Sequence, residues 1–105
     1  MKLPSKVKVG HVTYRLTVWP ADFTPEDRWG ECDRVGAVIR IRDNHTGPRG
    51  AETVLHEVMH AIYHEADLSA QDGEERMVTR LSSMLATVLH DNPKLLEWIS
   101  AELKA

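Results

Sequence analysis

The residues best suited to chemistry in this 105-residue sequence form one short segment, His56-Glu57-Val58-Met59-His60. Two histidines four residues apart share one face of a helix, separated by about 6 Å of axial rise and about 40° of rotation. Their imidazole rings can therefore converge on one tetrahedral Zn²⁺ ion. Glu57 can then act as the general base on a water activated by the metal. The spacing predicts a zinc site with Glu57 as its catalytic residue.

A catalytic zinc also needs a third protein ligand, and the sequence offers three candidates. His64 continues the helical series, but it lies about 12 Å along the axis from His56, too far for one ion to reach all three histidines. Glu74 and Glu75 open the next predicted helix, and an antiparallel helix pair would return them to the histidines. The residues alone do not decide between Glu74 and Glu75 as the third zinc ligand.

Three helices are expected in the second half of the sequence. From about residue 51 to residue 67 or 68, apolar residues recur at helical spacing on one face. A second helix is expected to begin at residue 74 or 75, where the helix dipole favours acidic side chains. Asn92-Pro93 has the form of an N-cap followed by proline at the first helical position, which predicts a third helix over 93–103.

The first half of the sequence predicts two β-strands. Apolar and polar residues alternate with period two over 12–19, and Pro20 ends this run. Residues 35–42 repeat the alternation, and a loop is expected between the two strands. Together these elements predict one α+β domain over residues 1–105, with a small antiparallel sheet packed on two long helices and a short C-terminal helix.

The composition excludes several classes of partner. The hydrophobic fraction of 42% and the charged fraction of 28% are ordinary for a globular protein. A net charge of −3 gives no electrostatic argument for nucleic acid or an anionic membrane. No apolar run approaches the roughly 20 residues that a membrane span needs, and no secretory signal is evident. The single cysteine, Cys32, excludes an internal disulfide, so a cytoplasmic location is expected.

Four segments in order make the sequence resemble a known group of proteins. They are Trp29-Gly30-Glu31-Cys32-Asp33, Thr53-Val54-Leu55-His56-Glu57-Val58-Met59-His60-Ala61-Ile62, Glu74-Glu75-Arg76-Met77-Val78 and Asp91-Asn92-Pro93. Over nearly its whole length the chain resembles small phage and prophage proteins of a zincin-like type. They look like minimal gluzincins related to the ImmA/IrrE-type metallopeptidases.

The resemblance implies a zincin-like core with a glutamate ligand on the second helix. Glu75 matches the family pattern better than Glu74, because Val78 and Thr79 supply the apolar residue at plus three and the polar residue at plus four. Relatives usually carry Asn or Asp in place of Thr79, so this position departs from the pattern. The resemblance therefore implies zinc held by His56, His60 and Glu75. A phage origin would place the protein in the cytoplasm of a bacterial host.

Zincins commonly bind an extended peptide along an edge strand. If residues 37–42 form that edge, Arg40 or Arg42 would meet an acidic substrate side chain, although an ordinary solvated strand face is the preferred interpretation. Five other residues are candidates for bordering the site, each with a plainer interpretation as a packed or solvated side chain. They are Trp29, Glu31, Cys32, His45 and Tyr63.

The leading hypothesis is a zinc-dependent peptidase that acts on a protein or peptide substrate. The main alternative is a zinc-binding but catalytically inactive phage accessory or interaction protein. A third hypothesis is a metal-free interaction protein in which the histidine spacing is a coincidence.

Overall fold

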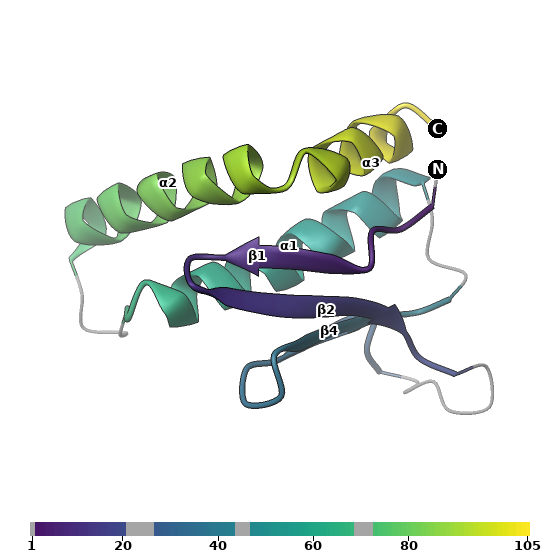
Figure 1. The fold of residues 1–105 in the computed structure, drawn as a ribbon, viewed down its shortest axis with the longest axis horizontal. Helices are drawn as coiled ribbons and strands as arrows, with labels where there is room; N and C mark the ends of the chain where they lie inside the picture. Colours follow the sequence, from purple (N-terminus) through teal and green to yellow (C-terminus); the bar gives the residue numbers. More distant parts are fainter. Residues whose placement is uncertain (1, 21–26, 44–46, 69–72) are drawn as a thin grey trace.

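The computed structural model describes residues 2–20, 27–43, 47–68 and 73–105 of the chain. Its elements follow one another along the sequence as shown in Figure 1. The strands are β1 (Lys6–Val9), β2 (Val12–Val18), β3 (Gly30–Asp33) and β4 (Val38–Ile41). The helices are α1 (Gly47–Glu65), α2 (Glu74–Asp91) and α3 (Pro93–Leu103). The expected α+β class is confirmed.

The sheet is mixed, so the expectation of an antiparallel sheet is wrong. Its strand order is β1-β2-β4-β3, and the pairs β1–β2 and β3–β4 are antiparallel. The central pair β2–β4 is parallel, with Arg15 opposite Val38 and Val18 opposite Ile41. Parallel pairing needs a long connection between the two strands, and the chain between β2 and β4 is long enough to contain β3.

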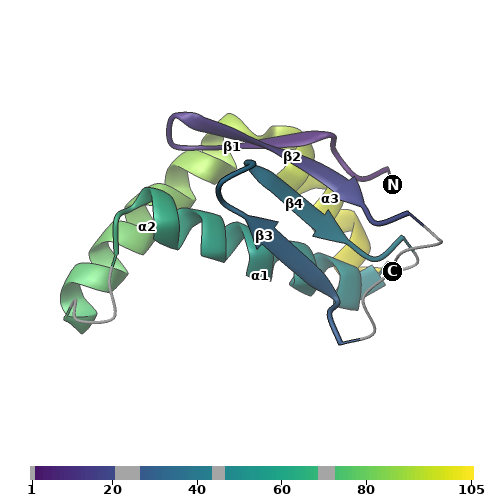
Figure 2. The ribbon, with the colours of Figure 1, turned by 90° about the horizontal axis from the view of Figure 1, so that it is seen from below.

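The two strands that the sequence pattern missed lie at the edges of this sheet. β1 buries Val7 and Val9 completely. β3 shows no alternation of apolar and polar residues, and it joins the sheet through backbone pairing with β4. Since β4 lies between β2 and β3, residues 37–42 do not form an edge, and the condition for a substrate contact by Arg40 or Arg42 is not met. The edge beside α1 is β3 (Figure 2).

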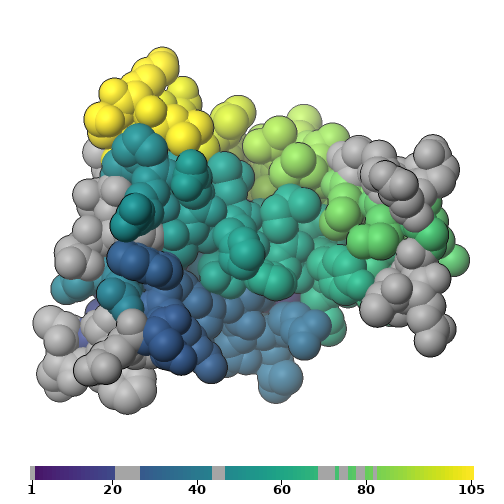
Figure 3. All heavy atoms as spheres, turned by 180° about the vertical axis from the view of Figure 1, so that it is seen from behind, coloured from purple at the N-terminus to yellow at the C-terminus, as the bar shows by residue number. Residues whose placement is uncertain are grey.

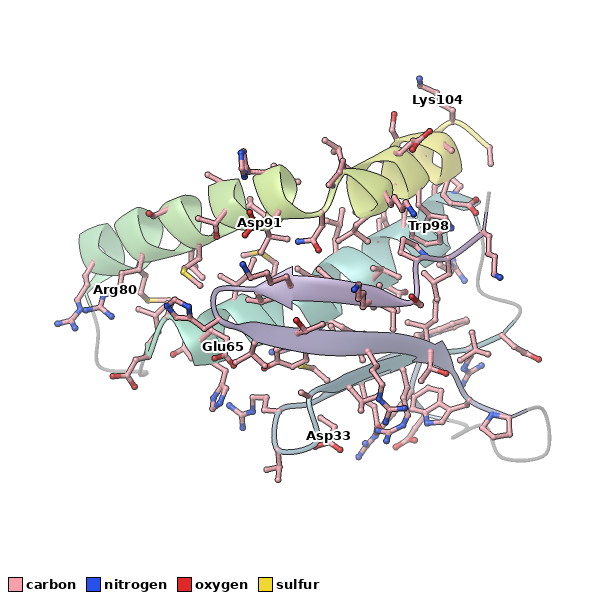
Figure 4. The ribbon with its side chains drawn as sticks, in the orientation of Figure 1. Asp33, Glu65, Arg80, Asp91, Trp98 and Lys104 are labelled. Atoms are coloured by element: carbon pink, nitrogen blue, oxygen red, sulfur yellow. The ribbon has the colours of Figure 1, made fainter. Side chains whose placement is uncertain are left out.

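The helices cover one face of the sheet and form a second layer (Figures 1 and 2). The core lies between the two layers. Its sheet side includes Tyr14, Leu16, Ile39 and Ile41, and its helix side includes Val54, Val58, Ile62, Trp98 and Ile99. Trp98 points from α3 into this core (Figure 4). None of the helices in the described part of the chain combines the length and apolar character needed to cross a membrane.

The helix that carries the histidines begins at Gly47, earlier than the expected start at residue 51. Gly47 has a φ of +69°, a conformation that glycine adopts readily, and Pro48 follows it within the first turn, where proline is tolerated. No acidic residue of the first turn itself balances the helix dipole there. Instead the buried carboxylate of Glu102, from α3, accepts the Gly47 N–H at 3.0 Å.

The opposite end of α1 is also held by side chains from other elements. Arg80, from α2, donates to the Ala66 carbonyl at 2.7 Å, just beyond the last residue of α1. The buried Tyr14 hydroxyl, from β2, donates to the Glu65 carboxylate at 2.8 Å. Figure 4 shows Glu65 beneath β2 and Arg80 on α2. Helix α1 is therefore fixed at both ends by contacts distant in sequence.

The junction of α2 and α3 falls at Asn92, as the sequence predicts. Pro93 occupies the start of α3, but the Asn92 side chain does not cap that helix. Its amide oxygen accepts the Lys8 N–H at 2.8 Å, and its amide nitrogen donates to the Lys8 carbonyl at 2.9 Å. The Asn92 side chain thus bonds both backbone polar groups of Lys8, on the side of β1 that faces away from β2.

Candidate metal centre

Two imidazole rings converge on the exposed face of α1. The Nε2 atoms of His56 and His60 lie 3.1 Å apart, and the ring planes are 77° from parallel. Zinc–nitrogen bonds of about 2.0–2.1 Å at a tetrahedral angle separate two ligand nitrogens by about 3.3 Å. The observed separation fits two ligands of one zinc ion. It results from the helix itself, because positions four apart fall on one face.

Glu57 lies beside this pair but on the inner side of the helix. One residue of helix turns a side chain by about 100°, so Glu57 points toward β3 and is only 7% exposed. Burial is the main cause that raises the pKa of its carboxyl above the ordinary value. His56 and His60 act against this rise, and the negative charge of Glu31 adds to it. A raised pKa suits a group that exchanges a proton with water near neutral pH.

Gly30 allows β3 to pass close to Glu57. A Cβ atom at this position would lie 2.9 Å from the Thr53 Cγ2 atom, 3.2 Å from the Glu57 Cγ atom and 3.2 Å from the Arg40 carbonyl oxygen. These distances are shorter than ordinary packing contacts, so a side chain here would force its neighbours to shift, and glycine permits the close approach of strand and helix. A glycine inside a strand is the sequence signal that indicates such close approach.

Two cavities open on either side of Glu57, on the face where α1 (teal) and β3 (blue) lie together in Figure 3. The larger has a volume of about 660 Å³, and its lining includes His56, Trp29 and Arg49. The smaller has a volume of about 360 Å³ and is lined by Cys32, Arg34, Glu57, His60 and Tyr63. Each cavity thus reaches one histidine, and both reach the carboxylate between them.

Trp29 forms part of the wall of the larger cavity and remains 49% exposed. The guanidinium carbons of Arg42 and Arg49 lie 4.5 and 5.3 Å from its ring centroid. Both arginines are therefore within cation–π distance of the indole. This placement favours the earlier alternative in which Trp29 borders the site.

The arginines of β4 and the residue after it are engaged within the protein. Arg40 forms an ion pair with Glu31 at 2.6 Å. Arg42 donates to the Arg28 carbonyl at 2.7 Å and lies over Trp29. Neither residue belongs to an edge strand, so the suggested contact with an acidic substrate loses its structural basis. Glu31 pairs with arginines rather than supporting a histidine.

Cys32 and Tyr63 both line the smaller cavity. Burial raises the pKa of the Cys32 thiol from an ordinary 9.0 to about 11, and the negative charge of Glu57 is the next cause. The thiol is therefore protonated near neutral pH. Among the described side chains, no third histidine, cysteine, aspartate or glutamate joins a group that could hold a metal.

The predicted third ligand, Glu75, belongs to the first turn of α2. The side chains of Glu74 and Glu75 lie outside the described part, as does His45. Arg80 of α2 contacts the end of α1. Glu75 lies earlier on α2, about 7 Å from Arg80 along the helix axis. The His64 side chain is 47% exposed and lies 4.0 Å from Glu65, on the same helix.

Sequence reasoning missed Arg34 and Arg49 as cavity residues, because α1, β3 and the β3–β4 turn meet only through tertiary contacts. A search of family models, curated proteins and solved structures finds no match to this chain. The chemistry of the site is therefore inferred from its own residues.

Proposed function

We propose that this chain is a zinc-dependent peptidase in which His56 and His60 hold the metal and Glu57 is the general base. The observation that supports this most strongly is the meeting of two Nε2 atoms, 3.1 Å apart, beside a buried carboxylate. Histidine nitrogens are preferred zinc ligands, and no other described pair on α1 converges in this way.

Zinc bound there would supply a Lewis acid that polarises a peptide carbonyl and lowers the pKa of water toward about 7. Glu57 takes the proton of the attacking water and returns it to the departing amine. Its position between both cavities lets it reach either side of a bound peptide bond.

For the third ligand we propose Glu75, on the pattern of residues that follow it. Glu75 belongs to the first turn of α2, and α2 packs against α1, the helix that carries both histidines. The substrate is a protein or peptide, and we place its cleavage in the cytoplasm, that of a bacterial host if the chain is phage-encoded.

A second candidate function is a zinc-binding accessory protein without catalysis. It is favoured by the exposure of both histidines on α1, which leaves the pair accessible to a ligand from another protein. In such a protein, a partner would complete the coordination at the exposed face of α1. Glu57 would then be a buried carboxylate with no proton to transfer.

The decisive experiment measures zinc and hydrolysis on protein purified without a metal-affinity tag. We expect close to one equivalent of zinc by elemental analysis, and cleavage within a broad panel of peptides. Glu57→Gln should retain zinc and lose cleavage by at least about a hundredfold, as expected for removal of a general base. Glu97→Gln, an exposed carboxylate of α3, is the matched control and should cleave normally.

Three results would contradict parts of this proposal. Wild-type protein that neither contains nor takes up zinc would refute the metal site. Zinc uptake without cleavage of any peptide would favour the accessory protein. Cleavage that persists in Glu57→Gln would remove Glu57 from the mechanism.

A further inference from the structure

The smaller cavity, lined by Cys32, Arg34, Glu57, His60 and Tyr63, is here named the Arg34 pocket. Arg34 lies in the turn between β3 and β4, directly after the strand that borders α1. It is exposed to solvent and yet lines the same cavity as His60 and Glu57. The pocket therefore joins a cationic side chain to the proposed metal ligand and the proposed base.

The other arginines around the site have partners within the protein. Arg28 and Arg40 share Glu31, at 3.3 and 2.6 Å. Arg42 bonds the Arg28 carbonyl, and Arg49 lies over Trp29. Their charges and donors are already used to hold β3, β4 and the start of α1 together.

Arg34 differs from them, since no hydrogen bond or ion pair joins it to the rest of the described chain. The nearest carboxylate in sequence, Asp33, is occupied by Arg40 at 3.8 Å and by the Gly36 N–H at 3.0 Å. Five N–H donors of Arg34 are thus available to a ligand. A planar guanidinium matches the two oxygens of a carboxylate in bidentate geometry, and carboxylates are the anions that an unmodified peptide carries.

The surroundings of Arg34 favour a negative ligand as well. The Cys32 thiol is neutral near pH 7, because burial raises its pKa to about 11. Tyr63 adds a hydroxyl that can donate a hydrogen bond. Glu57 is the one carboxylate among the lining residues, and it stands at the boundary with the larger cavity.

The size of the pocket limits what enters it. Its volume of about 360 Å³ is at the lower end of the range for small-molecule sites, about 300–1,000 Å³. The neighbouring cavity is nearly twice as large, at about 660 Å³, and has an indole on its wall. The Arg34 pocket therefore suits a single residue next to the bond that is cleaved.

We propose that the Arg34 pocket binds a carboxylate on the residue next to the scissile bond, on the His60 side of the site. The carboxylate is either an acidic side chain or the C-terminus of the substrate, and Arg34 recognises both by the same bidentate contact. This inference rests on the proposed peptidase function, and it names the substrate class of that site.

The test uses four probes that separate the two sources of the carboxylate. They are N-acetyl-glycyl-glutamate, its C-terminal amide, N-acetyl-glycyl-glutamine and N-acetyl-glycyl-glutamine amide. Each is titrated into the whole chain, with one equivalent of zinc and without metal, and binding is followed by NMR chemical shifts. We expect the carboxylate-bearing probes to bind about tenfold more tightly than the doubly neutral one, as for a charged hydrogen bond.

The matched variants are Arg34→Gln and Arg15→Gln. Arg15 is an exposed arginine of β2 that lines neither cavity of the site. The charge preference should disappear in Arg34→Gln and persist in Arg15→Gln, with both circular dichroism spectra unchanged. Preference for the glutamate amide would assign the pocket to an acidic side chain. Preference for the free-acid glutamine probe would assign it to a C-terminus.

The outcomes separate this inference from the proposed function. Equal affinity of all four probes, absence of binding, or a preference that survives Arg34→Gln would overturn the pocket assignment. If zinc does not bind and the Arg34-dependent preference remains, the peptidase proposal fails and the pocket stands. If Glu57-dependent cleavage occurs without any charge preference, the pocket assignment fails alone.

Discussion

At the scale of single residues, Gly30 determines how closely the edge strand approaches the proposed base. A Cβ atom at this position would press against Thr53 and Glu57, and these neighbours would have to shift to accept it. The position of the Glu57 carboxylate, and hence the desolvation that raises its pKa, depends on this contact. A change at Gly30 should therefore alter both stability and chemistry.

Gly30→Ala should lower the free energy of unfolding by about 1–3 kcal/mol, because the added methyl group overpacks the contact between β3 and α1. Urea denaturation measures this change. Gly73→Ala is the control, since a Cβ there would meet nothing within 4 Å; because Gly73 is the N-cap of α2, where alanine is less favoured than glycine, its cost should stay below about 1 kcal/mol. Equal effects of the two substitutions would show that β3 and α1 are not closely packed.

The half-buried environment of the Cys32 thiol allows a prediction about how its reactivity depends on pH. Because burial raises the pKa of its thiol from 9.0 to about 11, the folded protein contains about a hundredfold less thiolate at pH 8 than an ordinary thiol. Iodoacetamide should therefore modify Cys32 at least about a hundredfold more slowly in the folded chain than in urea. The rate should rise as the pH approaches 11.

The same shift has a consequence for stability. The pKa of the thiol is higher in the folded state than in the unfolded state, so the folded state binds its proton more tightly. This contribution to stability is complete below about pH 9 and decreases as the pH rises toward 11. Folded and unfolded chains that react equally fast at pH 8 would contradict the raised pKa of the half-buried Cys32 thiol.

The residues of the motif were predictable from sequence because their geometry is local. Positions four apart on any helix bring two side chains together, so His56 and His60 meet without help from other elements. The two cavity arginines that were missed, Arg34 and Arg49, were not predictable in this way. Arg34 reaches the site from the turn after β3 and Arg49 from the first turn of α1, and nothing in their local sequence indicates which cavity they line.

At the scale of elements, α1 is held in place by carboxylate and guanidinium groups from its neighbours. Glu102 bonds the N–H of Gly47 at its start, and Arg80 bonds the Ala66 carbonyl just past its end. Each charge has the sign that the helix dipole favours at that end. Both groups come from α2 and α3, so the C-terminal part of the chain fixes the position of the histidines.

Glu102→Ala should lower the free energy of unfolding by about 0.5–2 kcal/mol, since it removes a cap from the N-terminus of α1. Hydrogen exchange should accelerate at the amides of Gly47 to Ala51, while amides near His60 change less. Glu97→Ala, an exposed position of the same helix, should leave both quantities nearly unchanged. A uniform increase of exchange along α1 would show that Glu102 acts on the whole fold rather than on this end.

The helices and two of the strands followed from periodicity, while two strands and the sheet topology did not. β3 has only four residues, includes Gly30 and three polar or half-buried side chains, and exists because β4 offers it a partner. β1 is equally short. The parallel pairing of β2 with β4 joins segments separated by a whole strand, and local patterns contain no information on such pairing.

At the scale of the whole molecule, a bound metal should act as an additional stabilising contact. Zinc at one hundred times its dissociation constant would add about 2.7 kcal/mol of stability by mass action. For a domain of this size that corresponds to a rise in Tm of roughly 10–20 °C. If α2 provides a ligand, the metal also ties its first turn to α1.

The comparison of Glu75→Ala with Glu74→Ala tests directly whether the metal links the first turn of α2 to α1. Glu75→Ala should weaken zinc binding by at least about a hundredfold and abolish the zinc-dependent rise in Tm, because a ligand matters at least as much as the groups that support ligands. Glu74→Ala should retain both. Titration calorimetry and thermal denaturation with and without zinc are the measurements. Loss of binding in Glu74→Ala alone would transfer the ligand assignment to that residue.

The amide of Asn92 has a consequence for self-association. A sheet with two open edges can add copies of itself on both sides and grow into a filament. Here the Asn92 side chain occupies the Lys8 backbone on the outer side of β1, so growth from that edge is obstructed. Within the described sheet β3 is the other edge, and a sheet with one available edge can pair with one further copy but cannot extend into a filament.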